Sequence, residues 1–167
     1  MRPPHGLGHY LRDVVGGAND GVITTMAVIA GVAGASLPPN VALVLGTANL
    51  FADGFSMGAS GYLALKSELE QTGASVEHEQ PIRHGLATLA SFVVAGAIPL
   101  LAFLVSDPDQ RLWIASALSA LTLGAVGAAR SSFVRRPAWR CGAEMVFVGG
   151  IAAAMAWVMG WAASFVV

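Results

Sequence analysis

The sequence has 167 residues, of which 55% are hydrophobic and only 11% are charged, and its formal net charge is −1. So few charged residues, with the apolar residues gathered in blocks of about 20, exclude an ordinary soluble domain and are typical of an integral membrane protein. The near-zero net charge gives no sign of a nucleic-acid partner.

Five apolar blocks predict five membrane-spanning helices. Each block is long enough, at about 1.5 Å per residue, to cross about 30 Å of hydrocarbon. The first block carries Asp20 and is followed by four others, so we expect no cleaved signal peptide. We therefore expect an all-α integral membrane protein with one transmembrane domain over residues 1–167 and helices at residues 14–36, 41–65, 85–105, 112–129 and 142–167.

The connections between these blocks predict the orientation of the chain. Residues 37–40 form a proline-containing turn, residues 66–84 form a longer acidic loop, and residues 130–140 form a basic loop. The N-terminus and the second and fourth connections carry every Lys and Arg except Arg111. Because cytoplasmic segments are rich in Lys and Arg, we expect a cytoplasmic N-terminus and an external C-terminus in a bacterial inner or plasma membrane.

Three carboxylates lie inside the apolar blocks, namely Asp20, Asp53 and Glu144. Each costs about 2.5 to 3.5 kcal/mol on insertion into a bilayer, so such residues normally face a protein interior or a wet cavity. For Glu144, a salt bridge to Arg140 and the helix dipole offer a structural explanation. We therefore base the candidate site on Asp20 and Asp53.

The second block carries a polar stripe, because Asn49, Asp53 and Met57 are spaced four residues apart and share one helix face. By helix rise, Asp20 lies roughly 10 Å and Met57 roughly 13 Å from the cytoplasmic ends of their helices, so their depths are similar. Carboxylate oxygens alone suit Mg²⁺ or Ca²⁺, whereas an added methionine sulfur favours softer ions such as Fe²⁺. We expect Asp20, Met57 and Asp53 to be metal ligands, with packing as the alternative for Met57.

Other polar residues extend this candidate pathway. For the two asparagines among them, interhelical hydrogen bonding is the alternative explanation. Glycines spaced four apart on the first two helices, at positions 17 and 21 and at positions 54 and 58, would let helix backbones approach closely. The pathway candidates are Asn19, Asn49, Ser56 and Glu144.

The predicted acidic loop offers a second, weaker set of candidates. Its carboxylates and one histidine would attract cations electrostatically to the cytoplasmic mouth of the pathway. Gly73 and Pro81 interrupt the segment, so it shows no strict metal-ligand spacing. The residues are Glu68, Glu70, Glu77, His78 and Glu79.

Two motifs resemble those of one known family. The stretch DVVGGANDGV at residues 13–22, followed by GTANLFADGFSMG at residues 46–58, is similar to the vacuolar iron transporter family, including its nodulin-like and bacterial branches. The resemblance implies a homodimer that exports cytosolic Fe²⁺, often also Mn²⁺, in exchange for protons. It also implies that Asp20 and Met57 line the transport path.

The sequence departs from the family pattern at two places. Eukaryotic members carry a glutamate eight residues before the methionine, where this chain has Asn49, a neutral amide that cannot carry a proton. Asp53, one turn closer to Met57, is our candidate for the missing charge. Those members also insert a large cytoplasmic metal-binding domain between the second and third helices, where this chain has only residues 66–84.

Proton exchange is expected because a bound dication favours ionised carboxylates, so the ion and protons compete for Asp20 and Asp53. The expected partners are a second copy of the chain, the bilayer, Fe²⁺ or Mn²⁺, and protons. The sequence shows no nucleophile beside a base, no phosphate-binding glycine loop and no cofactor motif, so we expect neither an enzyme nor a cofactor. Two alternatives stay open, a transporter that prefers Mn²⁺ or Co²⁺ and a membrane metal sensor or scaffold that does not transport.

Overall fold

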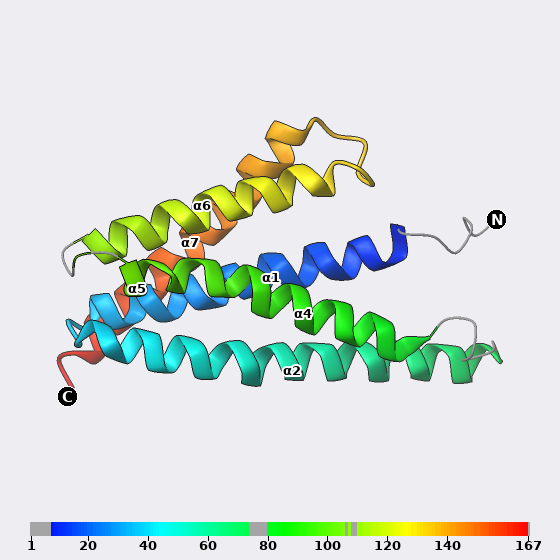
Figure 1. Ribbon diagram of the computed structural model, residues 1–167, viewed down its shortest axis with the longest axis horizontal. Coiled ribbons are helices and arrows are strands. Elements are labelled where there is room, and N and C mark those ends of the chain that lie inside the picture. The colour runs from blue at the N-terminus through cyan, green and yellow to red at the C-terminus, as the bar shows by residue number, and fades with distance from the viewer. Residues whose placement is uncertain (1–7, 74–79, 106, 108–109, 167) are drawn as a thin grey trace.

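The computed structural model describes residues 8–73, 80–105, 107 and 110–166. Every regular element in these residues is a helix, and five helices are long and apolar enough to cross a membrane, which confirms the predicted fold class and number of spans. The helices, labelled as in Figure 1, are α1 (Gly8–Gly34), α2 (Pro39–Thr72), α4 (Pro81–Leu100), α5 (Ala102–Val105), α6 (Arg111–Arg130) and α7 (Ala138–Ala163).

Helix α1 is the centre of the bundle. It contacts each of the other four long helices, most extensively α4 and α7, and half of its spanning segment is buried. Its buried side chains Val22 and Ile29 pack in two apolar clusters with residues from the neighbouring helices. The helix that carries Asp20 is therefore the most deeply buried of the spanning helices.

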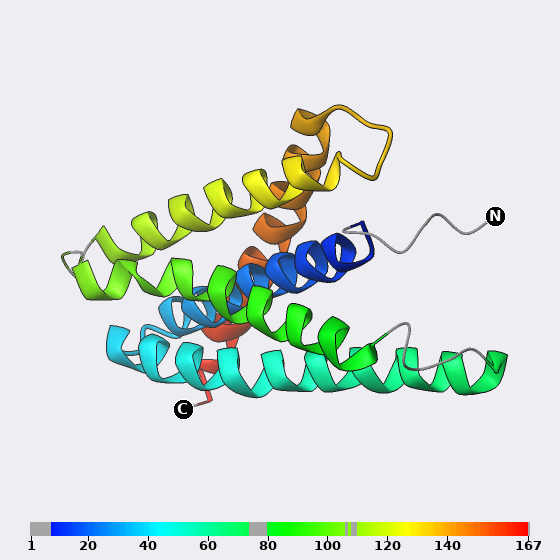
Figure 2. The same cartoon turned by 45° about the vertical axis from the view of Figure 1, so that its right-hand side comes forward.

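The helices alternate in direction along the bundle. Figures 1 and 2 show the start of α1, the far end of α2 and the connection between α6 and α7 at one end of the molecule. The turn between α1 and α2, helix α5 and the end of α7 lie at the other end. The predicted orientation places the Lys- and Arg-rich segments on one side of the membrane, and this arrangement of the helices gathers those segments at one end of the bundle.

Helix α2 continues beyond its predicted end at residue 65. It has 34 residues, about 51 Å at the helical rise, and therefore projects well past about 30 Å of hydrocarbon. Residues 66–72 contain no glycine or proline, and the helix ends at Gly73, which adopts the left-handed conformation with φ 66° and donates its N–H to the Leu69 carbonyl. Residues 66–72, predicted as loop, are consequently helical.

The ends of other helices also differ from the prediction. Helix α4 starts at Pro81 rather than at residue 85, because proline is well suited to the first turn of a helix. The predicted span at residues 85–105 is broken after Leu100, since Pro99 lacks the N–H that would continue the helical hydrogen bonds. Similarly, α1 begins at Gly8 instead of residue 14, and α7 runs from residue 138 to 163 instead of 142 to 167.

The predicted close approach at glycine pairs is confirmed, and α4 is the helix that both pairs contact. A Cβ added to Gly17 or Gly21 would overlap the backbone carbonyls of Thr88 or Phe92. On α2, a Cβ added at position 58 would lie 2.7 Å from the Gly85 carbonyl oxygen. Helix α4 therefore holds α1 and α2 in place together.

A second close crossing, between α1 and α7, gives a direct test of the packing. A Cβ at Gly160 would overlap the carbonyl oxygen of Gly31, whereas a Cβ at Gly150 on the same helix would meet nothing within 4 Å. We expect Gly160→Ala to destabilise the protein by about 1 to 3 kcal/mol, as overpacking does, and Gly150→Ala to leave its stability unchanged or raise it by up to about 1 kcal/mol, because alanine favours a helix more than glycine does.

Alanine has the same helix-forming advantage over glycine at both positions, so the difference in stability between the two variants reports the packing at Gly160. Thermal unfolding of each variant in the same detergent, followed by circular dichroism, measures the difference. Equal midpoints for the two variants would mean that α1 and α7 can separate to accept the methyl group.

Candidate functional site

Asp20 on α1 and Asp53 on α2 form the centre of the candidate site. Both carboxylates are partly buried, and they lie close enough for their charges to interact. Among the described residues, Asp53 is the only charged group that acts on Asp20, and neither carboxylate has a cationic or hydrogen-bonding partner. Two carboxylates without a cationic partner in the described part of the chain therefore lie within electrostatic range of each other in membrane-spanning helices.

Phe92 on α4 packs against the glycines that follow the two carboxylates. Each aspartate is followed directly by a glycine, and both glycines touch Phe92: Gly21 meets its backbone, and a Cβ at Gly54 would lie 3.1 Å from its ring Cδ1. The Phe92 side chain is fully buried, so it cannot move away from either helix without opening the core. The sequence analysis missed this residue, because a phenylalanine in an apolar block carries no signal that distinguishes it from others.

Met57 lies one helical turn beyond Asp53. Its side chain is partly buried and packs against the apolar cluster that includes Phe92 and Leu50. This contact agrees with the packing alternative, and it also leaves the thioether on the helix face that carries Asp53. A ligand role for Met57 stays a prediction.

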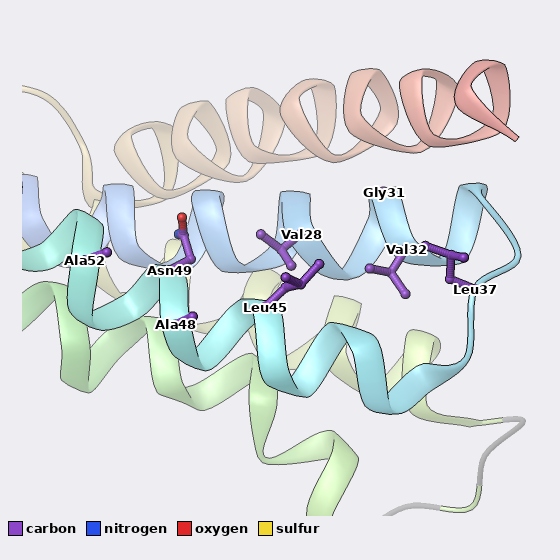
Figure 3. Close-up of a pocket in the computed structure, with 8 residues that line it drawn as sticks. All are labelled: Val28, Gly31, Val32, Leu37, Leu45, Ala48, Asn49 and Ala52. Carbon is purple, nitrogen blue, oxygen red and sulfur yellow. The ribbon is translucent and has the colours of Figure 1, made fainter. Parts of the chain in front are cut away.

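Asn49 lines a groove between α1 and α2. Figure 3 shows its amide among apolar side chains such as Val28 and Leu45, and the groove has a volume of about 530 Å³. Asn49 is the one polar residue of the lining in the described part of the chain. The lining residues are Val28, Gly31, Val32, Leu37, Leu45, Ala48, Asn49 and Ala52.

The remaining pathway candidates occupy different environments. The Oδ1 atom of Asn19 is buried without a hydrogen-bond partner among the described residues, while Ser56 is exposed on α2. Glu144 is 3.2 Å from Arg130 and 3.9 Å from Arg136. The expected salt bridge to Arg140 is therefore wrong, because the fold brings the end of α6 closer to Glu144 than the first turn of its own helix.

The acidic residues of the predicted loop are only partly described. Glu68 and Glu70 are exposed on the extension of α2, and Glu70 lies 3.9 Å from Lys66. Glu77, His78 and Glu79 fall outside the described residues. Within the described part of the chain, no three His, Cys, Asp or Glu residues gather closely enough to hold a metal ion.

One polar contact was not predicted. His84 on α4 and Asp13 on α1 form a hydrogen bond of 2.5 Å between Nδ1 and Oδ2, and the ring of Tyr10 stacks on His84 at 4.5 Å. The two partners are 71 residues apart, so no local pattern could have indicated their pairing. The contact joins α1 to α4 seven residues before Asp20, near the start of α1.

Comparison with known proteins gives the following relationships. A model of the VIT family matches residues 11–80 and 69–161 of the chain. Vacuolar iron transporter 1 of Oryza sativa is 41% identical over 73 residues, which cover 44% of this chain and 29% of that protein. The vacuolar iron transporter of Toxoplasma gondii is 23% identical over 221 residues, covering 90% of this chain and 73% of that protein.

A further relative is the vacuolar iron transporter of Plasmodium berghei, which is 32% identical over 71 residues. That match covers 42% of this chain and 26% of the relative. The chain thus matches less than a third of the length of the rice and Plasmodium proteins.

Proposed function

Since this chain belongs to the VIT family, we propose that it transports a divalent transition-metal ion, moving Fe²⁺, and also Mn²⁺, out of the cytosol in exchange for protons. The named relatives support the metal, because they are vacuolar iron transporters. The proposal also specifies the direction of transport, the coupling to protons and the use of Mn²⁺.

The pair of neighbouring carboxylates carries the proposal. Asp20 and Asp53 interact with each other and have no cationic partner among the described residues. Each ionised carboxylate costs about 2.5 to 3.5 kcal/mol in a bilayer, so an arrangement with two of them is favoured only when a cation or protons compensate the charge. A single divalent ion matches the charge of the pair.

Proton exchange follows from the same pair. When no metal is bound, two neighbouring carboxylates avoid carrying two negative charges by holding a proton. An entering dication favours the ionised forms and releases that proton. In this scheme, Met57 adds a soft ligand one turn away, which favours Fe²⁺ over Mg²⁺ and Ca²⁺.

A parallel two-fold dimer completes the proposed path. Leu45, one turn before Asn49 on α2, is 49% exposed in the single chain. The apolar groove beside Asn49 opens between α1 and α2. A second copy would cover these surfaces and place two Asp20 and Met57 pairs along one central path.

Ion uptake into liposomes tests the proposal. Purified protein is reconstituted around a metal-quenched dye, and Fe²⁺ or Mn²⁺ is added with and without a pH gradient across the membrane. We expect metal uptake that accelerates when the gradient drives protons in the opposite direction. Equal rates with and without the gradient would contradict proton exchange.

The same preparation separates transport from the alternative of a membrane metal sensor. A sensor would bind the ion, as measured by the metal that remains after gel filtration, but would not quench the enclosed dye. Competition between Fe²⁺, Mn²⁺ and Co²⁺ in the uptake assay then identifies the preferred ion.

A further inference from the structure

The connection between α6 and α7 and the start of α7 form a basic and aromatic surface at one end of the bundle (Figures 1 and 2). We call it the arginine–tryptophan surface. It consists of Phe133, Arg135, Arg136, Trp139 and Arg140, all of which are exposed. None of these residues belongs to the candidate metal site.

The charge of this surface is not neutralised by the protein. The one exception is Arg136: Glu144, the one acidic residue in residues 110–166, pairs with it and with Arg130. Among the described residues, neither Arg135 nor Arg140 has a carboxylate within ion-pair distance. Two guanidinium groups are therefore available to an anionic partner.

The aromatic residues place these arginines at a defined depth. Trp139, in the first turn of α7, is 69% exposed, and Phe133, in the connection after α6, is 44% exposed. Tryptophan is enriched where hydrocarbon meets the lipid headgroups. The guanidinium of Arg140 lies 5.2 Å from the centre of the Trp139 ring, which holds the charge at that same depth.

We infer that the arginine–tryptophan surface binds the phosphate groups of anionic phospholipids in the adjacent membrane leaflet. Trp139 and Phe133 insert at the boundary of the hydrocarbon, and Arg135 and Arg140 contact the headgroup phosphates, to which guanidinium donates paired hydrogen bonds. The inference rests on the membrane-spanning helices and these side chains, and it does not depend on the proposed metal transport.

The opposite end of α6 also exposes a tryptophan, Trp113, but it has fewer arginines among the described residues. Its one arginine, Arg111, is partly buried and lies 5.9 Å from the ring centre of Phe103. Lipid binding through arginines is consequently expected at the end that holds the connection between α6 and α7.

Native mass spectrometry of the detergent-purified protein tests the inference. The protein is titrated with phosphatidylglycerol, phosphatidylcholine or inorganic phosphate, and the bound molecules are counted. We expect phosphatidylglycerol to bind in preference to phosphatidylcholine, and an excess of inorganic phosphate to leave it bound. Equal binding of the two lipids, or displacement by inorganic phosphate, would overturn the inference.

Substitution then assigns the site. Arg135→Gln with Arg140→Gln should lower the affinity for phosphatidylglycerol roughly thirty-fold, given the usual contribution of each basic residue near an anionic surface. Arg12→Gln with Arg83→Gln removes two exposed arginines, one near the start of α1 and one from the first turn of α4, and serves as the matched control. The same loss in the first double variant and in the control would show that binding depends on overall charge and would overturn the inference.

A second pair of variants separates charge from folding. Arg135→Lys with Arg140→Lys retains the positive charge and should recover most of the lost affinity, since a lysine still attracts an anionic headgroup. A lysine variant that stays as weak as the glutamine variant, with an unchanged unfolding midpoint, would contradict a charge-based lipid site.

Discussion

Asp20→Asn should reduce metal uptake into liposomes to the rate of liposomes without protein, while the protein still folds and assembles. Asparagine has nearly the same size as aspartate and still forms hydrogen bonds, but it can neither neutralise a cation nor exchange a proton. The carboxylate of Asp20 has no hydrogen-bond or ion-pair partner among the described residues, so the substitution breaks no contact that holds the fold.

Asp107→Asn is the matched control for this result, because Asp107 is exposed in the connection before α6. Initial uptake rates and gel-filtration profiles of both variants are compared with those of the parent protein. Undiminished uptake by Asp20→Asn would exclude Asp20 from the transport path, and loss of uptake together with aggregation would show instead that the residue supports folding.

Asp53→Asn should weaken the dependence of uptake on pH more than it lowers the uptake rate at the optimal pH. The reason is that Asp53 interacts electrostatically with Asp20 and is our candidate to carry the proton that Asn49 cannot carry. Uptake rates of the parent and the variant across a series of pH values measure the effect. Identical pH profiles would contradict the proposed role of Asp53.

A second substitution sharpens this test. In the Asp53→Asn background, Asn49→Glu should restore part of the pH dependence, because position 49 lies one turn from position 53 and beside the groove next to α1 (Figure 3). Asn49→Gln in the same background provides the control, since it lengthens the side chain without adding an ionisable group. Equal recovery by Glu and Gln would mean that size, not charge, matters at this position.

Some of the site was predictable because its signals are local. A carboxylate inside an apolar block stands out in the sequence, and helical periodicity places Asn49, Asp53 and Met57 on one face of α2. The structure brings Asp20 and Asp53 within electrostatic range, although their predicted role as metal ligands stays a prediction.

Other features depend on residues that are distant in the sequence. The contact of Phe92 with Gly21 and Gly54, and the hydrogen bond between Asp13 and His84, require a particular crossing of α1, α2 and α4. Glu144 pairs with the end of α6 for the same reason. Helical spacing within one segment gives no information about which face of another helix it will meet.

The sequence by itself determined the five spanning helices, their alternating direction and the two aspartates within the apolar blocks. These follow from the length of each apolar block against a hydrocarbon layer of about 30 Å, a constraint that acts on each helix separately. Only the tertiary structure decided that α4 packs against both α1 and α2 and places Phe92 against the glycines that follow the two aspartates. Helix rotation and crossing depend on close packing between small residues and side chains of different helices, and the bilayer does not specify that packing.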